Sequence, residues 1–184
     1  MTKDWCILLA AGKSKRFGGP KAMAEWQGRS LISRAVETAQ AGFGENVLIV
    51  WGAYEFSQIQ GVHKVFNEKW RQGMGASLSC ALRWLDHNHY DPKGVLVMTV
   101  DQPRIAPSHC KALADKGREE GLSVLTSNGK IDGPPAFLLR KDYMKLLNLK
   151  DDRGAKAYLD KYASIEVGSG VFMDIDTPDD LKKL

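Results

Sequence analysis

The sequence predicts an α/β protein whose sheet is mostly parallel and is covered by helices on both faces. Short apolar runs alternate with amphipathic stretches along the chain, which is typical of this fold class. Three of the runs, at residues 5–10, 47–51 and 95–100, are almost continuously apolar, as expected for strands that are buried on both faces. We therefore expect these three strands to form the centre of the sheet.

The stretches between these runs carry apolar residues at helical spacing. Residues 31–40 are followed by Gly42 and Gly44, which predict the end of a helix. Residues 76–86 repeat the helical spacing, and residues 107–120 begin with a proline, which is favoured in the first turn of a helix. Each of these helices is expected to connect two strands.

The second half of the chain is less regular. Strands are predicted at residues 122–126, 136–139 and 165–167, and helices at residues 143–147, at residues 155–162 and from residue 178 onward. No low-complexity linker and no internal repeat divides the chain. We therefore expect one domain over residues 1–184.

The composition excludes several classes of protein. With 43% hydrophobic and 26% charged residues, the chain is neither collagen-like, nor a coiled coil, nor disordered. No apolar run approaches the roughly 18 residues that cross a membrane, and no secretory signal pattern is present, so we expect a cytoplasmic protein. Cys6, Cys80 and Cys110 have no paired spacing and are expected to be buried thiols, without disulfides or a zinc site.

The positive charge is concentrated in one segment. The whole chain has a net charge of +4, whereas residues 11–34 alone contain six basic residues and one acidic residue, a local charge of +5. This segment is rich in glycine and poor in aromatic residues. It therefore predicts a site for a small polyanion and not a surface for nucleic acid.

The first strand leads directly into the loop LAAGKSKRFGGPK at residues 9–21. Small residues in such a loop leave backbone N–H groups free to approach phosphates. The pattern G-x-x-x-x-G-K-[ST] is absent, because Ile7 occupies its first glycine position. The dinucleotide pattern G-x-G-x-x-G fails at Leu78, where its third glycine would stand. The loop is therefore a phosphate site of another kind, and no NAD binding is expected.

Further motifs follow this loop, in order, over nearly the whole chain. With Leu9-Ala10-Ala11-Gly12, Arg16 and Pro20-Lys21 at the start, they are Asn67 with Trp70, Gly73-Met74, Ser77 with Ser79, Asp101-Gln102-Pro103, Asp152-Arg153-Gly154-Ala155 and Asp174-Ile175-Asp176-Thr177-Pro178. Together they resemble the MobA-like nucleotidyltransferases of molybdenum cofactor synthesis. The resemblance implies a Rossmann-like three-layer sandwich of the nucleotide-diphospho-sugar transferase type.

The resemblance also implies a reaction. Leu-Ala-Ala-Gly with Pro-Lys resembles the members that transfer CMP from CTP to molybdopterin with Mg²⁺ and release pyrophosphate, whereas guanylyl members usually carry Ala-Gly-Gly and Asp-Lys. A molybdenum hydroxylase is then the implied partner that receives the cofactor. Guanylyl or other nucleotidyl transfer to a different phosphorylated acceptor, including a sugar or isoprenoid precursor, remains an alternative, as does a catalytically inactive nucleotide-binding relative.

Candidate site residues follow from the motifs and their chemistry. The nucleotide-binding residues implied by the resemblance are Leu9, Ala10, Ala11, Gly12, Arg16, Lys21, Asn67 and Ser77. Arg16 can bind the triphosphate as a forked donor, and Lys21 can place a point charge on the α-phosphoryl oxygens. For Ser77, helix capping remains an alternative to nucleotide contact. Arg16, Lys21 and Asp101 are the expected catalytic residues.

Two carboxylates are expected to hold Mg²⁺. Asp101 closes the most apolar strand, at the edge where open α/β sheets bind ligands. Asp174 matches the second metal-facing position of the family. Asp176 and Thr177 can either take part in the site or cap the last helix.

The chain departs from the family pattern at two places. Val100 stands where relatives usually have a glycine, and Gly133-Pro134-Pro135 replaces Gly-His-Pro or Gly-Asn-Pro. The second change removes a polar side chain on the acceptor side. The motifs therefore define the nucleotide better than the acceptor.

Overall fold

A seven-stranded sheet is the centre of the computed structural model, which describes residues 4–147, 149 and 154–184. Its strand order is β5-β4-β1-β6-β8-β7-β9, and β8 is antiparallel to both of its neighbours whereas the other pairs are parallel. The strands are β1 (Trp5–Ala10), β4 (Val47–Trp51), β5 (His63–Phe66), β6 (Gly94–Thr99), β7 (Ser123–Ser127), β8 (Asp132–Leu139) and β9 (Tyr162–Glu166). A short hairpin of β2 (Glu25–Trp26) and β3 (Arg29–Ser30) lies outside this sheet.

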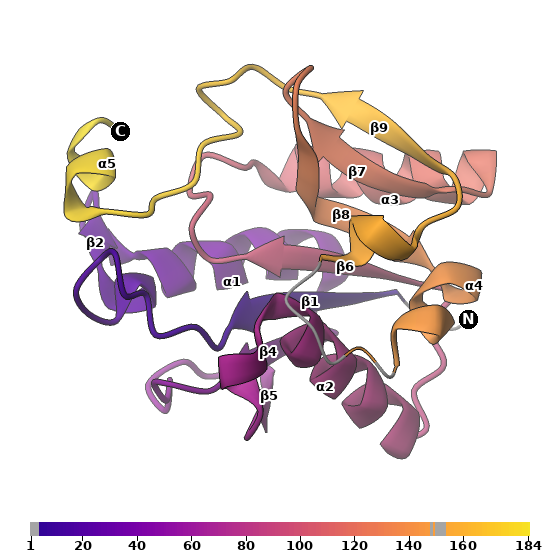
Figure 1. Cartoon of the computed structure of the whole chain (residues 1–184), viewed down its shortest axis with the longest axis horizontal. Helices are drawn as coiled ribbons and strands as arrows, with labels where there is room; N and C mark the ends of the chain where they lie inside the picture. The colour runs from indigo at the N-terminus through magenta and orange to yellow at the C-terminus, as the bar shows by residue number, and fades with distance from the viewer. Residues whose placement is uncertain (1–3, 148, 150–153) are drawn as a thin grey trace.

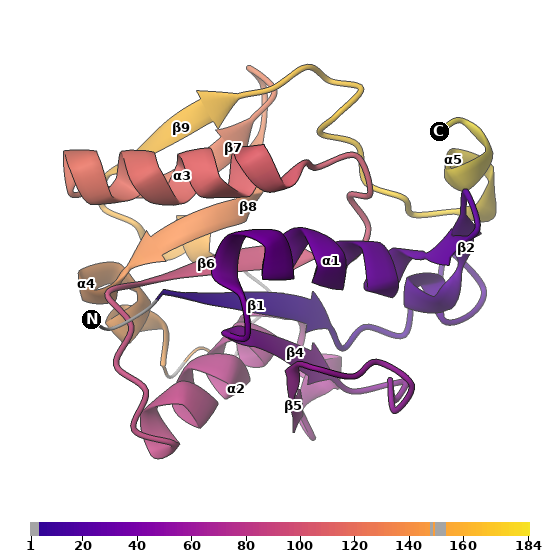
Figure 2. The same cartoon turned by 180° about the vertical axis from the view of Figure 1, so that it is seen from behind.

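Helices cover both faces of the sheet. They are α1 (Leu31–Phe43), α2 (Met74–His87), α3 (Pro107–Glu120), α4 (Arg140–Tyr143) and α5 (Pro178–Lys182), with 3-10 turns η1 (Lys21–Met23), η2 (Trp70–Gln72), η3 (Met144–Leu146) and η4 (Ala155–Tyr158). Helix α2 lies on the face that is nearer to the viewer in Figure 1. Helices α1 and α3 pack against each other on the opposite face, which Figure 2 shows from its own side. The three-layer α/β fold with a mostly parallel sheet is thus confirmed.

The central strands are buried because each faces helices on both sides. Every residue of β1 is buried. Cys6 and Leu8 pack in the layer of α1 and α3, whereas Ile7 and Leu9 pack in the layer of α2. A strand that buries both of its faces needs a continuous apolar sequence, which is why these strands could be read from the sequence.

The edges of the sheet differ from the sequence prediction. The sequence does not predict strand β5, because its residues His-Lys-Val-Phe are half polar. At the sheet edge three of its side chains are only partly buried and Phe66 is exposed. Strand β9 begins at Tyr162, which pairs with Ser123, and not at residue 165. The helix predicted at residues 155–162 is therefore wrong beyond Tyr158, because the chain must extend there to pair with β7.

Smaller differences concern element ends and one cysteine. Strand β8 begins at Asp132, four residues before the predicted start, and α4 begins at Arg140. Cys6 and Cys110 are buried free thiols, as expected, but Cys80 is partly exposed on α2. Among the described residues, none of the helices combines the length and apolar character needed to cross a membrane.

The C-terminal segment returns to the end of the central strands. The backbone N–H of Ile175 donates to the carbonyl of Asp101, 2.9 Å away. Thr177 caps α5 by accepting from the backbone N–H of Asp180, whose carboxylate accepts from Thr177 in return. This crossing places residues 174–176 beside the loop that follows β6.

Candidate active site

A cleft of about 360 Å³ opens at the carboxyl ends of β1 and β6. Eight of the predicted site residues line it: Leu9, Ala10, Ala11, Gly12, Arg16, Lys21, Ser77 and Asp101. They meet because the loops that follow parallel strands gather at one edge of the sheet. Asn67 and Asp174 are not among the lining residues.

The loop after β1 forms one wall of the cleft. It turns at Ser14, whose carbonyl accepts hydrogen bonds from the backbone N–H groups of Phe17 and Gly18. Gly18 has a φ of +81°, a conformation that glycine adopts without a steric penalty. The turn leaves Arg16 exposed on the loop, and η1 then anchors the chain through the buried Ala22.

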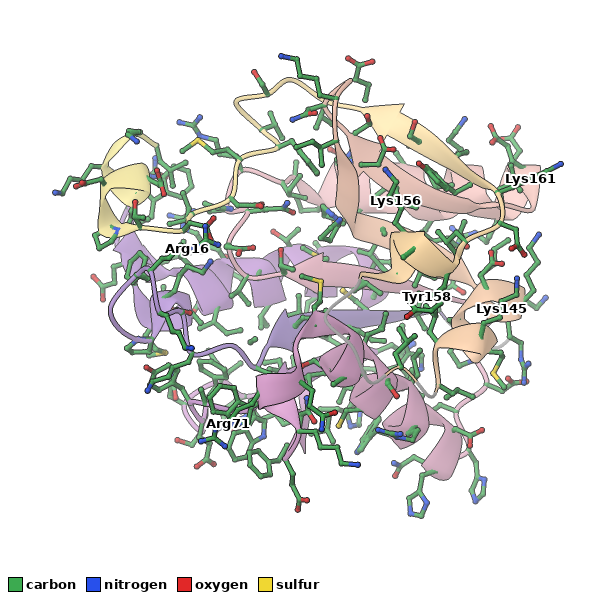
Figure 3. All side chains as sticks on the ribbon, viewed as in Figure 1. Arg16, Arg71, Lys145, Lys156, Tyr158 and Lys161 are labelled. Carbon is green, nitrogen blue, oxygen red and sulfur yellow. The ribbon has the colours of Figure 1, made fainter. Side chains whose placement is uncertain are left out.

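Cations and carboxylates alternate across the cleft. The Nζ atom of Lys21 lies 2.7 Å from Oδ2 of Asp101 and 3.5 Å from Oδ1 of Asp176. Arg16 Nη1 lies 3.0 Å from Oδ2 of the same Asp176. Figure 3 shows Arg16 at this edge of the sheet, whereas Lys145 and Lys161 lie at the opposite side of the molecule. The side chains of Arg16 and Lys21 therefore place two positive charges beside the cleft.

Asp176 forms ion pairs at the cleft and does not cap the last helix. Because Thr177 is the residue that caps α5, the Asp176 carboxylate is directed instead to Arg16 and Lys21. The sequence alone could not decide whether Asp176 caps the helix or takes part in the site, because an acidic residue just before a helix is compatible with both roles. Only the return of the C-terminal segment brings this acid to the loop after β1.

Several buried polar atoms near the end of β6 have no partner among the described residues. They are Oγ1 of Thr99, Oδ1 of Asp101 and Oε1 of Gln102. A buried polar atom without a hydrogen bond is costly, and such atoms gather where a ligand is missing. The orphaned Asp101 oxygen is thus free to serve as a ligand oxygen.

Asp174 adds a second carboxylate to this region. Its Oδ1 accepts a hydrogen bond of 2.8 Å from Nε2 of Gln102. Although the residue is exposed overall, desolvation of the carboxyl group raises its pKa, and the charges of Asp101 and Asp176 raise it further. A cation placed here would relieve that repulsion.

These carboxylates would suit a divalent metal ion that is shared with a substrate. No cluster of three or more potential metal ligands occurs within residues 4–147, 149 and 154–184. Mg²⁺ commonly takes only one or two carboxylates and completes its coordination with substrate phosphates and water. Asp101 and Asp174 are the two carboxylates that suit this arrangement.

Asn67 and Ser77 are joined by a hydrogen bond, with Ser77 in the cleft wall and Asn67 buried behind it. The Nδ2 group of Asn67 donates to Ser77 Oγ at 3.0 Å, and Asn67 Oδ1 accepts from the backbone N–H of Lys69. Ser77 lines the cleft, whereas Asn67 is buried with 3% exposure. Asn67 therefore holds the segment that presents Ser77 and does not itself face the cleft. Ser77 does not cap α2, whose N-cap is Gly73.

Gly52 is a structural residue of the site that the sequence analysis missed. A Cβ atom at this position would lie 2.5 Å from Trp70 Cβ and 2.9 Å from the carbonyl oxygen of Ala11. The absent side chain lets Trp70 pack against the start of the loop, where the N–H of Ala53 donates to the Ala11 carbonyl. The only signal in the sequence was a glycine directly after an apolar strand.

The remaining predicted motifs lie around a second cavity of about 580 Å³. Gly133-Pro134 and Gly154-Ala155 line it, and Leu9 and Met74 line both this cavity and the cleft. Asp152 and Arg153 lie outside the described residues. The two hollows are thus adjacent, and the second one includes the Gly133-Pro134 segment, where the chain departs from the family pattern.

Known proteins are similar to this chain in sequence or in fold. The chain is 30% identical over 173 residues to nicotine blue oxidoreductase of Paenarthrobacter nicotinovorans, which covers 91% of this chain and 79% of that protein. A probable molybdenum cofactor guanylyltransferase of Aquifex aeolicus is 42% identical over 52 residues, or 28% of this chain and 26% of that protein. The crystal structure of Rv0371c from Mycobacterium tuberculosis H37Rv in complex with manganese superposes with a TM-score of 0.78 at 21% identity, covering 99% of this chain and 97% of that one.

The family itself is shown by a longer match. Residues 6–165 match the model of the MobA-like NTP transferase domain, a stretch that runs from β1 to β9. This match contains both the loop after β1 and Asp101. It confirms the resemblance found in the sequence motifs: the chain belongs to the family of MobA-like NTP transferases.

Proposed function

We propose that this protein is a Mg²⁺-dependent nucleotidyltransferase that transfers CMP from CTP to the phosphate of molybdopterin and releases pyrophosphate. The observation that carries the proposal is the position of Lys21, which lies between Asp101 and Asp176 on the cleft wall beside Arg16. Such a set of cations and carboxylates suits a triphosphate with its metal ion. The preference for CTP rests on Leu-Ala-Ala-Gly and Pro-Lys in the loop.

The reaction needs alignment and charge neutralisation more than acid–base chemistry. A phosphate oxygen of the acceptor attacks the α-phosphorus, and the bond from that phosphorus to the pyrophosphate oxygen breaks. A phosphate monoester has a second pKa of about 6, so the attacking oxygen is already ionised near neutral pH. No general base is therefore required of this chain.

The chain's own groups stabilise the charge that develops. Lys21 neutralises the α-phosphoryl oxygens, and the exposed guanidinium of Arg16 binds the outer phosphates. Backbone N–H groups of the loop after β1 add dipoles on the same side. Arg16 and Lys21 form ion pairs with Asp176. When the phosphates bind, their oxygens replace the Asp176 carboxylate as partners of these two cations.

Asp101 and Asp174 are the residues that would hold the metal ion. When bound, Mg²⁺ supplies charge neutralisation on the phosphates and fixes their alignment. The related Rv0371c structure contains manganese, and both ions accept carboxylate oxygens. The unpartnered Oδ1 of Asp101 supports this assignment.

Thermal stabilisation by nucleotides is the experiment that tests the proposal. CTP with Mg²⁺ should raise the melting temperature more than GTP, ATP or UTP, because only a ligand that binds the native state stabilises it. Arg16→Ala should remove the shift. Arg29→Ala is the matched control, since Arg29 pairs with Glu37 and does not line the cleft.

The outcomes separate the alternatives. A shift with GTP alone would replace cytidylyl by guanylyl transfer. A CTP shift without pyrophosphate release in the presence of molybdopterin would indicate an inactive nucleotide-binding relative.

We also propose a cytoplasmic location and delivery of the product to a molybdenum hydroxylase. Co-purification with such an enzyme would test the proposed delivery.

A further inference from the structure

Gln102 connects the two carboxylates of the proposed metal site. It directly follows Asp101 in the loop after β6, and its Nε2 group donates to Oδ1 of Asp174 at 2.8 Å. The neighbouring backbone is joined as well, because the N–H of Ile175 donates to the carbonyl of Asp101. Figure 1 shows the segment between β9 and α5 as it passes the loop after β6. One backbone and one side-chain hydrogen bond thus join these two segments.

The side-chain bond opposes a repulsion between carboxylates. Asp174 is exposed, and the charges of Asp101 and Asp176 act against its ionised form. A carboxylate without a partner in this position would turn toward water, where its charge is better solvated. Among the residues that the structure describes, Gln102 is the one that donates a hydrogen bond to the Asp174 carboxylate. Gln102 therefore holds Asp174 on the side of Asp101.

The contact with Asp174 fixes the orientation of the Gln102 amide. A carboxylate accepts hydrogen bonds, so the NH₂ group faces Asp174 and the carbonyl oxygen Oε1 points away from it. Gln102 is 7% exposed, and its Oε1 has no hydrogen-bond partner among the described residues. A buried carbonyl without a donor is costly. A donor on the far side of the amide would therefore stabilise this orientation.

Gln102 also lines a cavity of about 10 Å³ between α1 and the end of β6. Thr99 lines the same cavity, and its buried Oγ1 likewise has no partner within the described part of the chain. Thr38 of α1 contributes a second hydroxyl group to the wall. A cavity of this size accommodates one water molecule, and a buried water makes about three hydrogen bonds. One water that donates to Gln102 Oε1 and bonds to the Thr99 hydroxyl would satisfy both atoms.

We propose that Gln102 is a positioning residue that holds Asp174 beside Asp101, and that a buried water between Gln102 and Thr99 keeps its amide in the donating orientation. The inference rests on the proposed function, since it concerns the metal site of that reaction. Gln102 does not line the cleft, so it acts on the reaction through Asp174. Hydrogen-bond partners that orient a metal ligand commonly change metal affinity by roughly 10- to 100-fold.

Binding of Mn²⁺, measured by electron paramagnetic resonance with and without CTP, tests the positioning role without turnover. Gln102→Met keeps the length of the side chain but removes the donor, and it should weaken Mn²⁺ binding by about tenfold. In an Asp174→Ala background the same substitution should change the affinity by less than about twofold, because the group that Gln102 holds is absent. Gln102→Asn withdraws the amide by one methylene group and should act like Gln102→Met, should the latter not fold.

The water has its own test and its own variant. A crystal structure of the metal-free wild-type protein should contain an ordered water within hydrogen-bond distance of Gln102 Oε1 and Thr99 Oγ1. Thr99→Val removes one partner of this water and should weaken Mn²⁺ binding, but by less than Gln102→Met does. Gln40→Met is the matched control, because the Gln40 amide donates to the Gly61 carbonyl away from the cleft lining, and it should leave Mn²⁺ binding unchanged.

The contrary results distinguish this inference from the proposed function. An equal loss of Mn²⁺ affinity with and without Asp174 would overturn the positioning role, as would unchanged affinity of both Gln102 variants. A crystal structure without a water at Gln102 Oε1 would overturn the second part of the inference. Wild-type protein that binds no Mn²⁺ in either condition would overturn the proposed metal site together with the inference. Mn²⁺ binding without pyrophosphate release would overturn the proposed reaction alone.

Discussion

Lys21 Nζ lies 2.7 Å from Oδ2 of Asp101, although 80 residues separate the two in the sequence. Both side chains are mostly shielded from water, with 11% and 20% exposure. The pair joins the loop after β1 to the end of β6, which are neighbouring strands. The ammonium group thus places one positive charge between carboxylates, in the region where we propose that a divalent cation binds.

Removal of this ammonium should make the protein depend more on metal ions. Lys21→Ala leaves the Asp101 carboxylate without its partner and should lower the free energy of unfolding by about 1 to 3 kcal/mol. Mg²⁺ should raise the melting temperature of this variant more than that of the wild type, because the ion replaces the lost charge. Lys13→Ala, on the exposed part of the same loop, is the control and should show no such difference. Equal Mg²⁺ responses in all three proteins would contradict the expectation.

Asp101→Asn should abolish turnover without unfolding the chain. The substitution keeps the shape of the side chain but removes the charge that binds a metal ion, so pyrophosphate release should fall by at least about 100-fold. Circular dichroism should remain that of the wild type. Asp91→Asn changes an exposed acid that pairs with Arg140 outside the cleft, and should retain activity. Near-native turnover of Asp101→Asn would show that the metal assignment is wrong.

Asp174→Asn should stabilise the fold while it impairs catalysis. The pKa of Asp174 is raised by desolvation and by the neighbouring carboxylates, so its charge is unfavourable at neutral pH. Asparagine can still accept the hydrogen bond from Gln102. In EDTA, the free energy of unfolding of the variant should therefore exceed that of the wild type by up to about 1 kcal/mol. Denaturant titration and pyrophosphate release measure the two effects. A variant that is less stable in EDTA would argue against repulsion at this position.

Gly52→Ala should displace Trp70 or the start of the loop after β1. The added methyl group would lie 2.5 Å from Trp70 Cβ, so either Trp70 or the loop must move, at a cost of about 1 to 3 kcal/mol. Stabilisation by CTP should weaken as well. Gly42→Ala is the control, because it lies in α1 with nothing within 4 Å and alanine favours a helix. Equal stability of the two variants would show that the packing at Gly52 tolerates a side chain.

Asp132→Asn should produce a stability loss that depends on pH. Hydrogen bonds from Lys156, Ser127 and Tyr162 lower the pKa of Asp132 from 3.8 to about 2, so the charged form stabilises the fold. This stabilisation is complete above the unfolded pKa and is lost as the pH falls toward 2. Because the pair is partly exposed, the variant should be less stable by up to about 1 kcal/mol at neutral pH. Urea titrations between about pH 7 and pH 3 should show the difference shrinking below about pH 4. A difference that stays constant at the lowest pH would contradict the ion pair.

The sequence by itself determined the central strands, the connecting helices and the family. Strands β1, β4 and β6 were readable because burial on both faces demands continuous apolar residues, and α3 because a proline and a glycine mark its ends. The loop at residues 9–21 and Asp101 were readable because each follows such a strand, where ligands bind in this fold class.

The tertiary structure decided which of these groups meet. Nothing local in the sequence distinguishes Asp176 as a partner of Arg16 and Lys21 from Asp176 as a helix cap, because the ion pairs form only when the C-terminal segment returns to the sheet. The close approach of Trp70 to Gly52 depends in the same way on a strand end and a turn that are separated in the sequence. Periodicity and capping are local properties, whereas a binding site is made of contacts that only the packing of the layers creates.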